Sequence, residues 1–365
     1  MRIVTLGKSG LSASEIGLGL AAIGRPGYIT LGRGRDLGDD RSVESLRTKA
    51  HDLLDAAYVG GVRYFDAARS YGLAEEFLAS WLLRGLHSGQ LCGDITVGSK
   101  WGYRYTADWQ VGAEVNEVKD HSLAHLRRQL AETRAILGDS LCLYQIHSAS
   151  LDGGVLADKA VLHELERLKD SGLAIGLTVS GVDQSDVIRR AIAIVAGGEP
   201  LFATVQATWN LLERSAGPAL AEAKQAGLGV IVKEALANGR LVGAAGAGSD
   251  GAAEADDADK EADDEGDAAL ATAPGPADAA PDSPLAPLAR LARRLGRRQE
   301  AVAIAAALAQ PWSDVVLSGA VTTAQISSNL AAAKMILSAD DLLSLAELAE
   351  PPDRYWATRA SLAWT

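Results

Sequence analysis

The stretch GVRYFDAARSYG, residues 61–72, is the pattern that decides which fold we expect. A short apolar run ends in Asp66, a loop with Tyr71 follows, and a helical pattern begins at Glu75. A continuous apolar run of this length is typical of a parallel strand that is buried on both faces. A strand, a loop and a helix in this order form the repeating unit of parallel α/β folds.

The same unit occurs eight times along the 365 residues. The expected strands are 15–23, 61–67, 94–100, 141–147, 174–180, 202–208, 228–234 and 314–319. The expected helices are 41–58, a helix from Glu75, 117–137, 157–170, 184–196, 216–226, 285–309 and a helix from about 323. Eight such units favour an α/β fold of the (β/α)8 TIM barrel class over an open sheet. We expect one domain over residues 1–365.

Two segments lie outside this repeat. Residues 1–14, MRIVTLGKSGLSAS, place turn residues between two short apolar runs, so they predict a β-hairpin that plugs the N-terminal mouth of the barrel. Residues 243–285 are rich in Ala, Asp, Glu, Gly and Pro, with almost no large apolar residue. Such a segment cannot bury enough surface to offset its ordering entropy. We therefore expect a disordered acidic insertion after strand seven, and a solvated loop without function is its simplest interpretation.

Charge and composition exclude several classes of protein. The formal net charge is −12, but twelve acidic residues and one lysine between 250 and 282 account for −11 of it. The remaining chain is nearly neutral and has no basic stripe, so nucleic acid is not an expected partner. No apolar run has the length of a signal peptide or a membrane span, and two cysteines do not make a disulfide framework. We expect a cytoplasmic protein that does not bind a membrane.

Polar residues end three successive predicted strands. Asp66 ends the second strand, Lys100 the third and His147 the fourth, while Tyr71 lies in the loop after Asp66. Taken singly, Asp66 could cap a helix, Lys100 could be a surface residue and His147 could be a satisfied core histidine. Because the catalytic groups of (β/α)8 enzymes stand at the C-terminal ends of different strands, the four together predict a site at one mouth of the barrel.

The residue types indicate proton transfer to or from an oxygen. A buried lysine beside Tyr71 is expected to lower the pKa of the phenol towards working pH, and Asp66 is expected to supply the counter-charge of the lysine. A phenol tuned in this way can give a proton to a carbonyl oxygen or take one from an alcohol. His147 can donate a hydrogen bond to the same oxygen and hold the carbonyl in place.

The segments FDAARSYG, VGSKWGY and YQIHSAS resemble the Asp, Tyr, Lys and His segments of the aldo-keto reductase superfamily. LGKSGLSASEIGLGL is similar to the hairpin and first strand of that family, and the resemblance covers nearly the whole chain except 243–285. It implies a (β/α)8 barrel, a nicotinamide cofactor and reversible interconversion of a carbonyl and an alcohol. In that case Tyr71 is the general acid or base, Lys100 and Asp66 tune it, and His147 orients the carbonyl.

The resemblance also implies a set of cofactor-binding positions, with Gln206 at the carboxamide and Asn210 completing a Q-x-x-x-N pattern. These are Ser180, Gln206, Gly319, Ala320, Gln325 and Asn329. Lys233 stands at or next to the position where the family commonly stacks an aromatic residue on the nicotinamide. Residues 317–332 hold no cation for a 2′-phosphate, so NADP(H) is favoured over NAD(H) only by the usual preference of the family.

The loops after strands one and three are expected to line the substrate pocket. They supply Tyr28, Trp101, Tyr103, Tyr105 and Trp109, an aromatic wall that suits a sugar face, an aromatic aldehyde or a polycyclic ketone. A helical pair, His121 and His125, lacks the glutamate of a zinc motif, so no metal is expected. The main hypothesis is an oxidoreductase. The alternative is a non-catalytic cofactor-binding or interaction protein on the same barrel, with the acidic insertion as a partner-binding tail.

Overall fold

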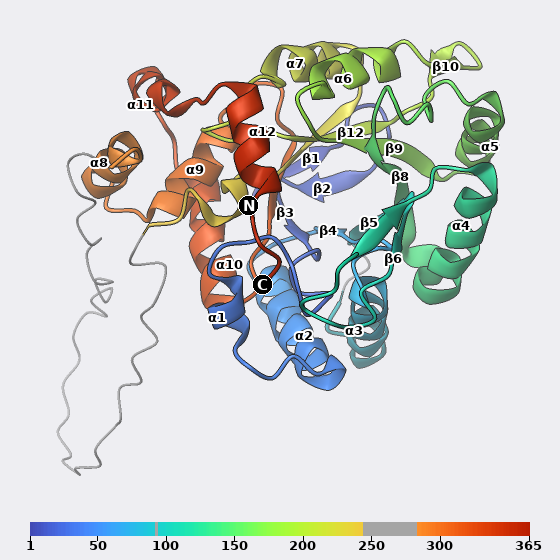
Figure 1. The fold of residues 1–365 in the computed structure, drawn as a ribbon, viewed down its shortest axis with the longest axis horizontal. Coiled ribbons are helices and arrows are strands. Elements are labelled where there is room, and N and C mark those ends of the chain that lie inside the picture. The colour runs from blue at the N-terminus through green and yellow to red at the C-terminus, as the bar shows by residue number, and fades with distance from the viewer. Residues whose placement is uncertain (92–93, 244–282) are drawn as a thin grey trace.

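The structure is a computed structural model that describes residues 1–91, 94–243 and 283–365. Parallel strands close into a barrel in the order β12-β13-β14-β3-β4-β5-β8-β9, with helices around it (Figure 1). The barrel strands are β3 (Ile16–Gly19), β4 (Tyr64–Asp66), β5 (Thr96–Trp101), β8 (Leu141–Ala149), β9 (Ala174–Val179), β12 (Thr204–Thr208), β13 (Gly229–Lys233) and β14 (Val315–Ser318). Each overlaps its predicted segment, and the predicted (β/α)8 barrel is confirmed.

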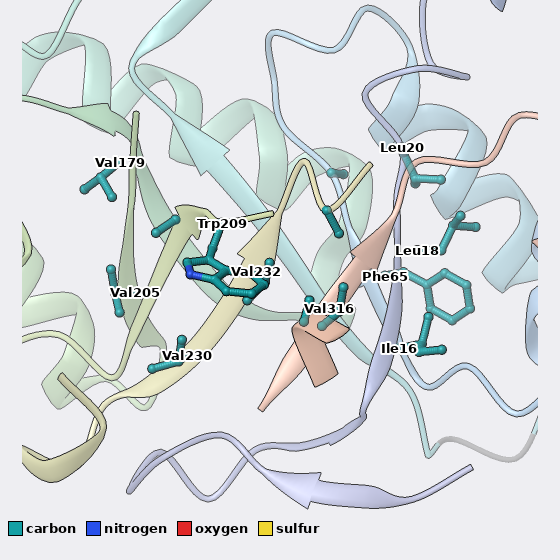
Figure 2. Close-up of a cluster of buried hydrophobic side chains, with 14 of the residues drawn as sticks. Ile16, Leu18, Leu20, Phe65, Val179, Val205, Trp209, Val230, Val232 and Val316 are labelled. Atoms are coloured by element: carbon teal, nitrogen blue, oxygen red, sulfur yellow. The ribbon is translucent and has the colours of Figure 1, made fainter. Parts of the chain in front are cut away.

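The barrel strands are almost entirely buried because they pack on both faces. Val205, Val230 and Val232 belong to the large cluster of buried side chains, part of which is drawn in Figure 2. Ile231 alternates with its two neighbours and belongs to a second cluster. Successive side chains of a strand point to opposite faces. One set of apolar side chains therefore packs against the surrounding helices, and the other set fills the interior of the barrel.

The N-terminal hairpin closes one end of the barrel. Strands β1 (Ile3–Thr5) and β2 (Ser12–Ser14) pair antiparallel, and Leu6 packs with Tyr64 and Ile231 in the second cluster. Gly7 has a φ of 52°, and a Cβ there would lie 2.3 Å from the Gly227 carbonyl oxygen. The close approach of the hairpin to the barrel therefore requires glycine, and the predicted plug is confirmed.

Helices follow the barrel strands and cover them. These are α2 (Val43–Val59), α3 (Ala74–Ser88), α4 (Leu123–Leu137), α5 (Lys159–Asp170), α6 (Gln184–Ile192), α7 (Gly217–Gln225), α8 (Ala286–Arg294), α9 (Gln299–Leu308) and α10 (Thr323–Leu330). Ser42 and Ser122 cap α2 and α4, since each side chain accepts a hydrogen bond from a backbone N–H of the first turn. Within the described ranges no helix has both the length and the hydropathy to cross a membrane.

Three predicted helices differ from the structure. The helix predicted over 117–137 begins at Leu123, because β7 (Glu117–Lys119) pairs with β6 (Tyr103–Tyr105) in a hairpin. The helix predicted over 285–309 is α8 and α9, which are separated at Gly296 by a φ of 60°. The helix over 184–196 ends at Ile192, before β10 (Val195–Ala196) pairs with β11 (Glu199–Pro200). The predicted disordered insertion over 243–285 lies almost wholly outside the described residues.

The C-terminal segment returns to the barrel, which the sequence did not predict. Helices α11 (Ala339–Ser344) and α12 (Pro352–Ala360) follow α10, and α12 is drawn in red in Figure 1. The backbone of Thr365 exchanges two hydrogen bonds with Tyr28, both 3.1 Å long. Its carbonyl oxygen also accepts from Arg33 Nη1 at 2.8 Å. These contacts fix the chain end beside the loop that follows β3, which includes the short helix α1 (Arg33–Leu37).

Candidate active site

A cavity of about 1210 Å³ opens at the C-terminal ends of the barrel strands. It exceeds the roughly 300–1,000 Å³ of a pocket for an ordinary small molecule, so it can hold an extended ligand. The residues from strand ends that line it include Gly19, Asp66, His147, Gln206, Lys233 and Ser318. The cavity continues along the turn after β14 and is bordered by α12 and the C-terminal residues.

The Lys100–Asp66 pair reaches this cavity through Asp66, which lines it. Lys100 is the next-to-last residue of β5 and is 1% exposed, while Asp66 ends β4 and is 2% exposed. Lys100 Nζ donates to the carboxylate of Asp66 and, at 2.8 Å, to the carbonyl oxygen of Ala67. Burial lowers the pKa of Lys100, and the charge of Asp66 opposes that effect. The predicted counter-charge for the lysine is therefore in place.

The second oxygen of Asp66 is held by neutral donors from the barrel interior. Asp66 Oδ1 accepts from Tyr64 Oη at 3.0 Å, from Gln145 Nε2 at 3.2 Å and from Gln206 Nε2 at 3.1 Å. The aspartate is thus fixed by four side chains from four strands, including Lys100. Tyr64 and Gln145 were not identified from the sequence, although their inward direction follows from the alternation that places Asp66 and Gln206 inside.

Tyr71 lies over the lysine, as predicted, but its acidity differs from the prediction. Lys100 Nζ is 4.8 Å from the centroid of the Tyr71 ring, and the Tyr71 hydroxyl is 3.4 Å from His147 Nε2. Burial, followed by the negative charge of Asp66, raises the pKa of Tyr71 well above 10. The carboxylate that keeps the lysine charged also acts on the phenol, and with burial it reverses the predicted direction. Tyr71 is therefore a neutral phenol that can donate a proton.

His147 completes the group near the end of β8. Its ring contacts Tyr71, and Ser70 Oγ lies 3.3 Å from its Nδ1. Ser148, directly after it, has a φ of 50°, and the pairing of β8 with β9 shifts register here. Burial, then the charges of Lys100 and other cations, lowers the pKa of His147 well below 6.5. The imidazole is therefore neutral, with one nitrogen that donates and one that accepts a hydrogen bond.

Arg25 is a site residue that the sequence analysis missed. Its guanidinium carbon lies 4.9 Å from the ring centroid of Tyr28, 4.8 Å from that of Trp364 and 5.2 Å from that of Tyr71. Arg25 Nη1 donates to Glu117 Oε2 at 3.0 Å. The signal for it in the sequence is a cation between two glycines in GRPG, in the loop after the first strand that also holds Tyr28.

The predicted aromatic wall is only partly at the cavity. Tyr28 lines it, whereas Tyr103 is not among the lining residues and contacts the ring of His147 with 5.0 Å between centroids. Trp101 is 0% exposed and packs on His121 outside the cavity, which corrects its prediction as a substrate residue. Trp101 follows Lys100 on the same strand, so its side chain points to the opposite face. Trp109, whose Nε1 donates to the Arg41 carbonyl oxygen, is not among the residues that line the cavity.

The histidine pair of the sequence, His121 and His125, has structural contacts. A ring nitrogen of His121 lies 2.9 Å from the carbonyl oxygen of His147, so this side chain holds the end of β8. His125 is buried on α4 beside Asp120 and Arg128. In the described part of the chain, no three His, Cys, Asp or Glu side chains are grouped to hold a metal ion.

The turn after β14 brings together the cofactor residues predicted there. Gly319, Ala320, Gln325 and Asn329 all line the cavity. Gln325 Oε1 accepts from the Val321 N–H at 2.9 Å, and Gln325 Nε2 donates to Asp36 Oδ2 at 2.7 Å. Asn329 Nδ2 donates to Ser318 Oγ at 2.9 Å, while its Oδ1 is buried without a partner. The turn is thus pinned by its own side chains.

A second loop at the cavity, after β13, was not predicted. Glu234, Ala237 and Asn238 all have positive φ, at 56°, 48° and 55°. Such conformations carry strain and cluster at functional sites. Asn238 lines the cavity, and its Oδ1 is buried without a partner. The backbone of this loop contacts the loop after β3, where the Leu31 N–H donates to the Asn238 carbonyl oxygen at 3.0 Å.

Two cations, also not predicted, line the cavity at the end near the turn after β14. Arg298 precedes α9 and forms an ion pair with Glu300. Arg35 lies in α1, and its Nη2 is 3.7 Å from Asp36 Oδ1. Both arginines lie outside the phosphate-binding segment expected at residues 317–332, so the pattern of that segment does not reveal them.

Lys233, Ser180 and Gln206 line the cavity together at the ends of neighbouring strands. Lys233 Nζ donates to Ser180 Oγ and to Thr208 Oγ1, both at 2.7 Å. Burial lowers the pKa of Lys233 to about 8. Asn210, also predicted from the Q-x-x-x-N pattern, is 0% exposed and donates to the Glu234 carbonyl oxygen, so it supports the loop behind the cavity.

The comparisons with known proteins agree with this geometry. The model of the aldo/keto reductase family matches residues 16–350. The holo form of the aldo-keto reductase AKR11C1 from Bacillus halodurans is similar in structure, with a TM-score of 0.64 and 22% identity over 96% of this chain and 97% of that chain. The glycerol dehydrogenase AKR11B4 from Gluconobacter oxydans has a TM-score of 0.64 and 20% identity over 95% of this chain and 94% of that one. No curated protein sequence matches this chain.

Proposed function

Since the chain belongs to the aldo/keto reductase family, we propose that it interconverts a carbonyl compound and the corresponding alcohol with a nicotinamide cofactor. The carbonyl is an aldehyde or ketone, sugars included. The observation that carries this proposal is the convergence of Tyr71, Lys100, Asp66 and His147 at one end of one cavity. Polar groups from different strand ends are the usual catalytic groups of this barrel class.

Tyr71 is proposed as the proton donor in the reductive direction. Its raised pKa keeps the phenol protonated, and its hydroxyl beside His147 faces the place where a carbonyl oxygen would accept both hydrogen bonds. Loss of the proton leaves a phenolate, which the Lys100 and Arg25 cations near the Tyr71 ring stabilise. A bound nicotinamide supplies the hydride. In the oxidative direction the phenolate takes the proton of the alcohol.

His147 and Asp66 are proposed as positioning groups. His147 is neutral because burial and nearby cations lower its pKa, so it can donate a hydrogen bond without adding a charge. That bond would orient the carbonyl oxygen towards Tyr71. Asp66 holds Lys100 in its charged form although burial favours the neutral amine.

The cavity fits a nicotinamide dinucleotide in size and in chemistry. Asn238 and Asn329 each present a buried Oδ1 without a partner, and both residues line the cavity. A buried amide oxygen normally accepts a hydrogen bond, which the amino group of adenine could donate here. Ser180 and Gln206 lie near Lys233 and Asp66, where a carboxamide would contact them. Gly319 has open space around it, so a phosphate could approach the backbone there.

We propose NADP(H) as the preferred cofactor, with NAD(H) as the alternative. Arg298 and Arg35 can supply the charge-assisted donors that a 2′-phosphate prefers. Glu300 and Asp36 now hold these two cations, so binding of a 2′-phosphate requires an exchange of partners. With NAD(H), the same carboxylates could accept hydrogen bonds from ribose hydroxyls.

The proposal is tested by titrating the protein with NADPH and, separately, with NADH while tryptophan fluorescence is followed. Trp364 lines the cavity and provides a local signal. Saturable binding of either cofactor, followed by its oxidation when aldehydes, ketones, sugars or dihydroxyacetone are added, supports the proposal. Absence of binding to both would contradict it and favour the alternative, a non-catalytic interaction protein on this barrel.

A further inference from the structure

Lys233 is a cation at the barrel mouth that lacks a carboxylate partner among the described residues. Three neighbouring cations are paired there: Lys100 with Asp66, Arg25 with Glu117, and Arg359 with Glu234. Among the residues that the structure describes, no carboxylate oxygen lies within ion-pairing distance of Lys233 Nζ. Its two hydrogen bonds go to the hydroxyls of Ser180 and Thr208. An ammonium has three N–H donors, so one is free to face the cavity.

The nearest carboxylate, Glu234, is committed to another cation. Arg359 Nε donates to Glu234 Oε2 at 2.9 Å, and a second guanidinium nitrogen contacts Glu234 Oε1. Thr208 Oγ1 lies 3.3 Å from Glu234 Oε2, so a hydroxyl separates the glutamate from Lys233. The charges of these three ion pairs cancel, whereas no carboxylate of a described residue balances the ammonium of Lys233.

The position of Lys233 gives this charge a chemical consequence. Lys233 pairs in register with Thr208, two residues along β12 from Gln206, and it contacts Ser180 after β9. Gln206 and Ser180 are the residues proposed above for the carboxamide of the nicotinamide. The field of Lys233 also reaches the catalytic group, because it contributes to lowering the pKa of His147.

We propose that Lys233 discriminates between the two redox states of the bound cofactor, and this inference rests on the proposed function. The oxidised nicotinamide ring carries one positive charge, and the reduced ring, which has gained a hydride, carries none. A fixed ammonium beside the ring repels only the oxidised form, and in a partly buried site this repulsion is poorly screened. The reduced cofactor is therefore bound more tightly relative to the oxidised one. The reduction potential of the bound couple rises, and the oxidised cofactor leaves more readily after carbonyl reduction.

The preference for the reduced over the oxidised cofactor should depend on pH, and the groups that face Lys233 determine how. They are Glu234 and Arg359 behind it and Lys100 and Asp66 across the barrel. Burial lowers the pKa of Lys233 to about 8, so its charge is lost as pH rises through that value. The pKa of Glu234 is about 2 and that of His147 lies well below 6.5, so neither titrates there. Lys100 also has a lowered pKa and can contribute to the pH dependence of the Kd ratio. The pH dependence measured in a variant without Lys233 must therefore be subtracted from that of the wild type.

The experiment measures Kd for the oxidised and reduced forms of the same cofactor on the full-length protein, by calorimetry or tryptophan fluorescence. The ratio of the two Kd values cancels contributions of the phosphates and adenosine, which are common to both forms. The variants are Lys233→Met, which removes the charge, and Lys233→Arg, which keeps it. Lys159→Met removes the same charge from an exposed position on α5 and is the matched control.

We expect Lys233→Met to lower the ratio of oxidised to reduced Kd at least about tenfold, which for a two-electron couple equals about 30 mV. Lys233→Arg and Lys159→Met should stay close to wild type. In the wild type the ratio should fall between about pH 7 and about pH 9, and in Lys233→Met it should change less. This wild-type measurement keeps the test open if the methionine variant does not fold.

An unchanged ratio in Lys233→Met, or an equal change of both Kd values, would overturn the inference and leave Lys233 as a packing residue. Absence of binding of either redox form to the wild type would instead overturn the proposed function. The two failures are therefore distinguishable.

Discussion

Lys100 holds its ammonium nitrogen 4.8 Å from the centroid of the Tyr71 ring. The same nitrogen donates to Asp66; Lys100 and Asp66 are buried, and Tyr71 is partly buried beside them. In this arrangement the protonated phenol is the stable form before reaction, and the lysine stabilises the phenolate only once the proton has left. A site that stabilises charge where it develops favours the transition state over the ground state.

We expect the effects of replacing Lys100 and Asp66 on the free energy of unfolding to be coupled. We expect that no neutral pair at these positions restores activity. Lys100→Met leaves the carboxylate buried with three neutral donors, and removal of one partner of a buried pair costs about 3–5 kcal/mol. Adding Asp66→Asn removes the unpaired charge and should recover most of that loss. Activity should stay at least about a hundredfold down in both variants, because Tyr71 has lost its cation.

Urea unfolding and turnover of the two single variants and the double variant measure this coupling. A double variant no more stable than Lys100→Met would show that the charges do not depend on one another.

Arg298 is expected to select the cofactor. Arg298→Met should weaken NADPH binding about tenfold or more and change NADH binding less than about twofold, because only NADPH carries the 2′-phosphate. Fluorescence titration of both cofactors measures the effect. Arg297→Met is the matched control, since Arg297 is exposed and does not line the cavity. Equal losses for NADPH and NADH would mean that Arg298 contacts a part common to both.

We expect the Glu234–Arg359 pair to make the free energy of unfolding decrease at acidic pH. The pKa of Glu234 is lowered from 4.5 to about 2, against the effect of burial, by the charges of Lys233 and Arg359. A carboxylate with a lowered pKa stabilises the folded state at pH values above its ordinary pKa of 4.5. That contribution is lost as the pH falls from 4.5 towards 2. The difference corresponds to about 3 kcal/mol.

Urea unfolding between about pH 6 and about pH 3 should therefore show a shallower loss of stability for Glu234→Gln than for the wild type. His121, whose pKa is lowered to about 4, titrates in the same range in both proteins, so the difference isolates Glu234. Identical slopes would show that the carboxylate is not held in its charged form by the fold. Arg359→Met removes one of the two cations that lower this pKa, so its slope should lie between those of the wild type and Glu234→Gln.

The barrel strands and the catalytic groups could be predicted because short stretches of sequence encode each of them. Continuous apolar runs marked all eight strands, and a polar residue at the end of a strand marked Asp66, Lys100 and His147. Trp101 was misplaced although the same rule was available, since the neighbour of an inward-pointing Lys100 must point outward.

Contacts between distant segments could not be predicted. Glu234 and Arg359 are 125 residues apart in sequence, and Arg25 meets Trp364 only because the chain end returns to the barrel mouth. The acidity of Tyr71 was misjudged for a related reason. The sequence shows that a lysine and an aspartate are near, but burial and the balance of the two charges depend on the folded geometry.

The most direct test of the account is a single-turnover measurement with Tyr71→Phe. Phenylalanine keeps the ring over Lys100 and removes only the hydroxyl. Protein saturated with NADPH or NADH is mixed with a carbonyl substrate of the wild type, and oxidation of the bound cofactor is followed. We predict a rate at least about a thousandfold lower and a cofactor Kd within about twofold of wild type. A variant that oxidises its cofactor at nearly the wild-type rate would contradict the assignment of Tyr71 as the proton donor.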